Sequence, residues 1–268
     1  MRDIIYKSDD FVIEQSPQYI LSIRFLADGL SFCVRTPEND VLLIECHIFD
    51  DADQQEILAY YKEVFLHEEI LSLEYSKIEA ICSSYDKLLI PNKLYDESLK
   101  QSYWDVCFTK DLDSYLFSTL FTLYDVQLVT EVKTLVESIL EDCNAPYVIY
   151  SEEAEFLSYN LEKLSSLELD KLLSVNVKGD YIDVAVLGYD KLLFYNSFDY
   201  LTTTDIIYNI LNVLDGLGIK IDDIKVLVYL DAFFDQNDLS LLEKYLGECI
   251  NIDSKDKISS FIYLQKSN

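Results

Sequence analysis

Two stretches of the chain carry side chains that could bind an anion. Arg24 is a cation within an apolar run, and Lys178 stands beside Gly179 in a short polar turn. A cation next to glycine can hold a phosphate-like anion, because glycine lets backbone N–H groups approach the ligand closely. The alternative for Arg24 is structural: it lies in a strand and pairs with a carboxylate. We expect the structural role, since the chain has 49 acidic residues.

Converging carboxylates would indicate a different chemistry, the metal-assisted cleavage of nucleic acid. The candidates are Asp28, Asp180, Asp183 and Asp231. Among 49 acidic residues such candidates arise by chance, and the net charge of -28 repels a polyanion. We therefore expect no nuclease activity and no nucleic-acid partner.

Histidine and cysteine chemistry is not indicated either. His47 and His67 lie far apart in sequence without metal-ligand spacing, so we predict no metal site and no Cys–His dyad. The six cysteines form no C-x-x-C pair and have mostly apolar neighbours, which is typical of reduced, buried thiols in a cytosolic protein. The glycine- and serine-based motifs of nucleotide sites and hydrolases are also missing from the sequence. The sequence predicts no catalytic residue.

The elements that hold the two anion-binding stretches form a repeat. Leu21–Val34 aligns without a gap with Leu173–Val186, and each copy predicts two apolar strands broken by a polar turn. In each copy a third apolar run follows, and then an amphipathic helix, at 41–49 and 51–66 in the first and at 191–198 and 203–217 in the second. A unit of three strands and a helix used twice implies two similar lobes.

Outside the repeats, predicted strands alternate with predicted helices, which indicates a mixed α/β structure. We expect strands at 10–15, 77–85, 104–108, 126–130, 226–230, 249–252 and 261–264, and helices at 111–121, 151–171 and 239–246. Leu112, Tyr115 and Leu116 would face inward from the helix at 111–121. The break at Asn144-Ala145-Pro146 predicts a first lobe at 1–145 and a second at 146–268.

Composition limits the partners of the chain. Half of the 268 residues are apolar, which is enough for one large core or two modest ones and argues against disorder. The strong negative charge opposes binding to anionic membrane surfaces. No stretch approaches the roughly 20 apolar residues that a membrane span needs, and the N-terminus does not read as a signal peptide. We expect a cytoplasmic protein.

Several segments resemble one known family. They are Leu21-Ser22-Ile23-Arg24, Lys87-Leu88-Leu89-Ile90-Pro91, Leu192-Leu193-Phe194-Tyr195-Asn196-Ser197-Phe198 and Asp205-Ile206-Ile207-Tyr208. Together with the duplicated unit, they resemble an uncharacterised bacterial family with an actin-like ATPase fold, over nearly the whole chain. The resemblance implies α/β architecture with duplicated ribonuclease-H-like lobes, each a mixed five-stranded sheet flanked by helices.

The phosphate-binding turns of the actin-like ATPases are altered here. In that superfamily an Asp in each lobe orients hydrated Mg²⁺ and the attacking water, whereas the matching positions here are Arg24 and Asn176. Tyr181 replaces a small hydroxyl residue, and the adenosine-binding glycines read Asp231-Ala232-Phe233-Phe234. If a nucleotide binds, the resemblance places it at Arg24, Asp28, Asn176, Lys178, Gly179 and Asp180.

These observations favour a protein without catalytic activity. We expect a scaffold or adaptor that acts through contacts with an unidentified protein partner and needs no cofactor. The alternative is a nucleotide-binding protein or weak ATPase of the actin-like superfamily, with ATP and Mg²⁺ as ligands.

Overall fold

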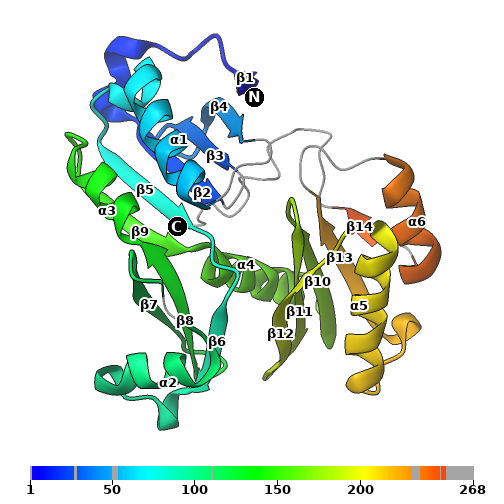
Figure 1. Ribbon diagram of the computed structural model, residues 1–268. Coiled ribbons are helices and arrows are strands. Elements are labelled where there is room, and N and C mark those ends of the chain that lie inside the picture. Colours follow the sequence, from blue (N-terminus) through cyan, green and yellow to red (C-terminus); the bar gives the residue numbers. More distant parts are fainter. Residues whose placement is uncertain are drawn as a thin grey trace. The chain divides into compact units, whose positions relative to one another are not determined.

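Both predicted repeats fold into the same meander of three antiparallel strands (Figure 1). The structure is a computed structural model that describes residues 2–26, 29–49, 54–109, 111–230, 236–247 and 249–251. The first meander is β2 (Ile20–Leu26), β3 (Gly29–Arg35) and β4 (Val41–Ile48); the second is β10 (Lys171–Val177), β11 (Tyr181–Gly188) and β12 (Leu192–Asp199). Leu21 pairs with Val34, and Leu173 pairs with Val186. The gapless alignment of the two copies is therefore confirmed in the strand register.

Parallel strands extend each meander in the same way. β5 (Lys77–Cys82) pairs with β2 and β9 (Tyr147–Ser151) with β5, while β13 (Lys225–Tyr229) pairs with β10 and β14 (Cys249–Asn251) with β13. The sheet orders are β1-β4-β3-β2-β5-β9 and β12-β11-β10-β13-β14. The first sheet has one strand more than predicted, because β1 (Arg2–Lys7) adds to the edge at β4.

Helices cover one face of each sheet with apolar side chains. In the first sheet this face packs against α1 (Gln54–His67) and α3 (Thr134–Glu141), and in the second against α5 (Thr203–Gly216) and α6 (Gln236–Leu246). Strand side chains alternate between faces, so Leu21, Ile23 and Phe25 enter the first core. The intervening Ser22 and Arg24 lie on the opposite face and are buried there as well. The two faces thus separate an apolar core from a buried polar layer.

A small third sheet forms between the repeats in sequence. It contains β6 (Lys87–Pro91), β7 (Ser114–Phe121) and β8 (Val126–Lys133) in the order β6-β8-β7. Trp104 from α2 (Lys100–Cys107) packs with Leu116 and Val129 in its own core. Five short 3-10 segments complete the described part of the chain: η1 (Ile13–Gln18), η2 (Glu69–Ser72), η3 (Asn92–Leu94), η4 (Glu97–Leu99) and η5 (Ile221–Asp223).

The chain divides into two compact units. The first contains the described residues of 1–120 and 127–154, and the second contains those of 121–126 and 155–263. The boundary falls at the start of α4 (Glu152–Ser166), so the first turn of this helix belongs to the first unit and the rest to the second.

Three secondary-structure predictions are wrong. Residues 104–107 end helix α2 and Phe108 caps it; the Trp104 and Phe108 rings, at i, i+4 spacing, are tilted by 49° with centroids 4.8 Å apart. Residues 114–121 form β7 rather than a helix, because pairing with β8 decides the structure of this segment; Leu112 is consequently exposed. Residues 10–15 form no strand, and 13–15 belong to the 3-10 segment η1. The strand expected at 261–264 lies outside the described residues.

Candidate functional site

The residues predicted for nucleotide binding, as far as the structure describes them, are divided between the two units. Arg24 is in β2 of the first unit, whereas Asn176 in β10 and the Lys178-Gly179-Asp180 turn belong to the second. Asp28 lies outside the described residues. Within the second unit, the turn residues come together because they connect β10 to β11.

Arg24 is held by a buried carboxylate. Its Nε donates to Oε2 of Glu152 at 2.9 Å, and its Nη2 donates to Oε1 of the same residue at 2.6 Å. The side chains of Arg24 and Glu152 are 9% and 0% exposed. Two parallel, charge-assisted hydrogen bonds hold the guanidinium plane in a fixed orientation. The prediction that Arg24 lies in a strand and pairs with a carboxylate is confirmed.

Glu152 opens helix α4, where the positive end of the helix dipole favours a negative charge. The next residue, Glu153, is also fully buried and accepts hydrogen bonds from the backbone N–H of Ser84 and the hydroxyl of Ser151, both at 2.8 Å. Burial, followed by the charges of Glu153 and Glu152, raises the pKa of the nearby Cys82 thiol. The start of α4 therefore gathers negative charge next to Arg24.

A second ion-pair cluster lies on the same face of the first sheet. Arg35 Nη2 is 2.5 Å from Oε2 of Glu79, and Lys77 Nζ is 2.9 Å from Oε1 of Glu79. Burial alone would raise the pKa of Glu79, but the hydrogen bond from Lys77 and the charge of Arg35 hold that pKa below its ordinary value. The cations of this face are thus opposed by carboxylates of the same unit.

In the second unit, Lys178 points inward rather than to solvent. Its Nζ lies 2.9 Å from Oδ2 of Asp183 and 3.1 Å from the hydroxyl of Tyr181, and 4.9 Å from the centroid of the Tyr181 ring. The side chains of Lys178 and Asp183 are 7% and 1% exposed. Asp183 Oδ1 accepts a further hydrogen bond from Ser197 at 2.7 Å. The lysine predicted to contact phosphate is neutralised by a carboxylate of its own hairpin.

The backbone of this turn is packed against an aromatic side chain. The Tyr200 hydroxyl donates to the carbonyl of Lys178 at 2.6 Å and lies 3.2 Å from the carbonyl of Gly179. The backbone N–H of Lys178 donates to the Tyr181 carbonyl at 3.0 Å, which closes the turn. Gly179 and Asp180 are exposed, while the bulky Tyr181 is buried beneath them. The turn is thus built around tyrosines where the ATPases have small residues.

The carboxylates considered for nuclease chemistry do not form a described metal site. Asp183 is engaged by Lys178 and Ser197, and Asp180 is exposed. Asp28 and Asp231 lie outside the described residues.

Sequence reasoning named Arg24 but missed its partner, Glu152. The two residues are 128 positions apart, and no local pattern joins them. The available signal was the Glu152-Glu153 pair directly after an apolar strand, at the start of an amphipathic helix.

A cavity of about 570 Å³ lies in the first unit, away from Arg24. Helix α1, segment η2 and helix α3 line it with apolar side chains, Phe65, Leu66, Leu71, Leu73, Leu135 and Ile139, and with polar ones, among them Lys62, Ser72, Ser138 and Asp142. A lining of apolar side chains with a few polar groups is typical of ligand pockets. Among the residues that the structure describes, no helix is long and apolar enough to cross a membrane.

Comparison with known proteins supports the assignment of the fold. Residues 8–249 match the family described as "Protein of unknown function (DUF3822)". A Bacteroides thetaiotaomicron protein with an actin-like ATPase fold and unknown function superimposes with a TM-score of 0.78 at 22% identity, over 93% of this chain and 98% of that chain. A PilM–PilN type IV pilus biogenesis complex gives a TM-score of 0.60 at 13% identity, over 87% and 88%. No curated protein matches the sequence. The predicted actin-like ATPase fold is confirmed.

Proposed function

The chain belongs to the family of unknown function DUF3822, and from that premise we propose that it is a non-catalytic, actin-like scaffold or adaptor acting through protein–protein contacts. Its partner is a protein, and it needs no nucleotide or other cofactor for this role. We place it in the cytoplasm, in keeping with cysteines that are not joined in disulfides: Cys33, Cys82, Cys107 and Cys143 have free thiols in the part of the chain that the structure describes.

One observation carries this proposal: Arg24 and Lys178, which would contact phosphate, are each engaged by a buried carboxylate. Removing one partner from a buried ion pair costs about 3–5 kcal/mol. Millimolar binding is worth about 4 kcal/mol, so a phosphate that displaced Glu152 or Asp183 would lose most of its binding free energy. The net charge of -28 adds long-range repulsion of polyphosphates.

Exposed apolar side chains support a role in protein contacts. Val106 at the end of α2 and Leu112 before β7 are 84% and 97% exposed, and Leu66 projects at the rim of the cavity beside α1. Exposed apolar side chains gain free energy when a partner surface removes them from water. One structure of similar fold comes from a complex of two proteins, the PilM–PilN type IV pilus biogenesis complex.

The first test is thermal unfolding of the purified chain with and without millimolar Mg-ATP or Mg-ADP. A ligand at 100 times its Kd stabilises the native state by about 2.7 kcal/mol, which gives an obvious rise in Tm. We expect no rise beyond that given by Mg²⁺ with an equal concentration of sodium sulfate. A nucleotide-specific rise would replace the scaffold with the alternative, a nucleotide-binding protein or weak ATPase that uses Arg24, Lys178 and Gly179.

The second test is affinity capture of the partner followed by quantitative binding of the purified pair. We expect Gly179→Ala, in the exposed turn, to leave the affinity unchanged, and Val106→Asp or Leu112→Asp to weaken it. A partner whose binding requires Mg-ATP and is abolished by Gly179→Ala would contradict a nucleotide-independent scaffold.

A further inference from the structure

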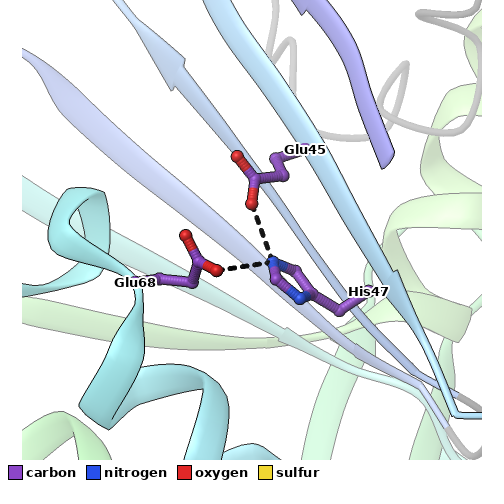
Figure 2. A group of neighbouring side chains, drawn as sticks. All are labelled: Glu45, His47 and Glu68. Carbon is purple, nitrogen blue, oxygen red and sulfur yellow. Dashed lines mark hydrogen bonds and ion pairs between the residues drawn. The ribbon is translucent and has the colours of Figure 1, made fainter. Parts of the chain in front are cut away.

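Three ligand-forming side chains converge at the outer part of the first sheet. Glu45 and His47 are two positions apart in β4, so they project from the same face of the strand, whereas Cys46 points to the other. Glu68 reaches them from the junction between α1 and η2. Figure 2 shows the two carboxylates directed at one edge of the imidazole ring. Their side chains are 1%, 9% and 11% exposed for Glu45, His47 and Glu68, so the cluster is largely withdrawn from solvent.

Both carboxylates approach the same ring nitrogen. His47 Nε2 lies 2.9 Å from Oε1 of Glu45 and 3.9 Å from Oε1 of Glu68 (Figure 2). One N–H group can satisfy the nearer oxygen, but 3.9 Å is beyond hydrogen-bond reach. One ligand atom from each of the three residues lies within 4.8 Å of the other two. The arrangement therefore presents one nitrogen and two oxygens around a common point.

This donor set matches a divalent transition metal. Zn²⁺ binds imidazole nitrogen and carboxylate oxygen at about 2.0–2.2 Å, so neighbouring tetrahedral ligands are about 3.3 Å apart. The two measured separations, 2.9 and 3.9 Å, lie on either side of that value. We propose that Glu45, His47 and Glu68 form a zinc site, with water as the fourth ligand. This proposal departs from the sequence prediction of no metal site. The sequence pattern does not show that Glu68, which follows helix α1, lies beside Glu45 and His47 of β4.

Rigid surroundings hold the three ligands. The ring of Phe32 in β3 stacks on the His47 ring, with centroids 6.1 Å apart and planes 22° from parallel. The backbone N–H of Glu68 donates to Val64 at the end of α1, and its carbonyl accepts from Leu71 in η2. Ligands fixed by packing and backbone hydrogen bonds lose little freedom when a metal binds. The bound ion would join the end of α1 to the outer strands of the sheet.

The test is calorimetric titration of the chelator-treated full-length protein with Zn²⁺, together with the Tm of the same samples. We expect one equivalent to bind and to raise the Tm. Glu68→Gln, which keeps the side-chain shape, should weaken Zn²⁺ binding by about tenfold or more. Substituting a residue that only hydrogen-bonds to a metal ligand already weakens metal binding by about tenfold. His47→Ala should abolish it. The matched controls are the exposed neighbours, His67→Ala and Glu69→Gln, which should bind as the unaltered chain does.

Two results would overturn the proposal: no stoichiometric Zn²⁺ binding by the folded protein, or binding that His47→Ala and Glu68→Gln leave unchanged. X-ray absorption spectroscopy of the zinc-loaded, unaltered chain identifies the atoms bound to zinc without any variant. Only nitrogen and oxygen around the zinc would support the site, whereas sulfur would show that cysteines bind the metal instead.

Discussion

At the scale of single residues, the ion pair of Arg24 and Glu152 decides how the first repeat is interpreted. An arginine replaces the aspartate expected from the actin-like ATPases, and the helix α4 supplies the carboxylate that it needs. The strand therefore carries a positive charge where a negative one is expected, and Glu152 of the same unit supplies the negative charge. Lys178 and Asp183 also form a buried ion pair, within a single hairpin.

Glu152→Gln tests the energetic importance of this pair. The substitution leaves the Arg24 charge buried without its counter-ion, so we expect a loss of about 3–5 kcal/mol in the free energy of unfolding, measured by urea denaturation. The double variant Arg24→Met/Glu152→Met should lose less than Glu152→Gln, because no charge remains buried. Glu97→Gln, which removes the charge of the carboxylate paired with Lys100, is the control and should have little effect, since that carboxylate is 62% exposed. A small effect of Glu152→Gln would show that the Arg24 charge is stabilised in another way.

Thiol reactivity is a second prediction at this scale. Burial, partly offset by the charge of Arg35, raises the pKa of Cys33 to about 12, and burial with the charges of Glu153 and Glu152 raises that of Cys82 further. The thiolate is the reactive form, so neither residue should react with iodoacetamide in the native state at mildly alkaline pH. The exposed Cys107 should react rapidly, contrary to the expectation that the thiols are all buried. Mass spectrometry of labelled peptides, with Cys107→Ser as the control, measures this order; labelling of native Cys82 ahead of Cys107 would contradict it.

At the scale of elements, the two hairpins share a register but not a turn. Gly29 pairs with Ile48, and a Cβ atom at Gly29 would collide with the carbonyl oxygen of His47. The aligned position of the second copy holds the bulky Tyr181, which packs under Lys178 and pairs with Asp199. The two copies therefore differ most in the turn between their first two strands.

Helix α5 provides a prediction for an element boundary. Thr202 accepts a hydrogen bond from the Asp205 backbone, and Asp205 Oδ2 accepts from the Thr202 backbone at 2.9 Å, which forms a capping box. Thr202→Ala should lower the free energy of unfolding by about 1 kcal/mol, because helix N–H groups lose their acceptor. Thr204→Ala, in the exposed first turn, is the control and should have little effect in the same urea denaturation. Equal losses from both substitutions would contradict the capping role.

At the scale of the whole molecule, charge repulsion acts against stability. The net charge of -28 is spread over 268 residues, and salt at 0.1 M screens charges more than about 10 Å apart. We therefore expect the Tm, measured by calorimetry, to rise as sodium chloride is added to a low-salt buffer. The effect should come from ionic strength, so potassium chloride should act equally; a falling Tm would mean that the internal ion pairs outweigh the repulsion.

The amino-acid sequence by itself determined the repeat, the strands of both hairpins and the helices that follow them. Alternating apolar residues can bury one face of a strand in a single register, so a local pattern is sufficient there. It also predicted that Arg24 would be structural, from the abundance of carboxylates.

Contacts between distant residues were decided by the tertiary structure alone. The edge strand β1 and the partner of Arg24 depend on neighbours that lie far away in sequence. The same holds for Glu68, which meets Glu45 and His47 only after α1 has crossed the sheet. Periodicity records which face of an element is buried, but not which polar groups meet there, because side-chain pairing depends on the packing of whole elements.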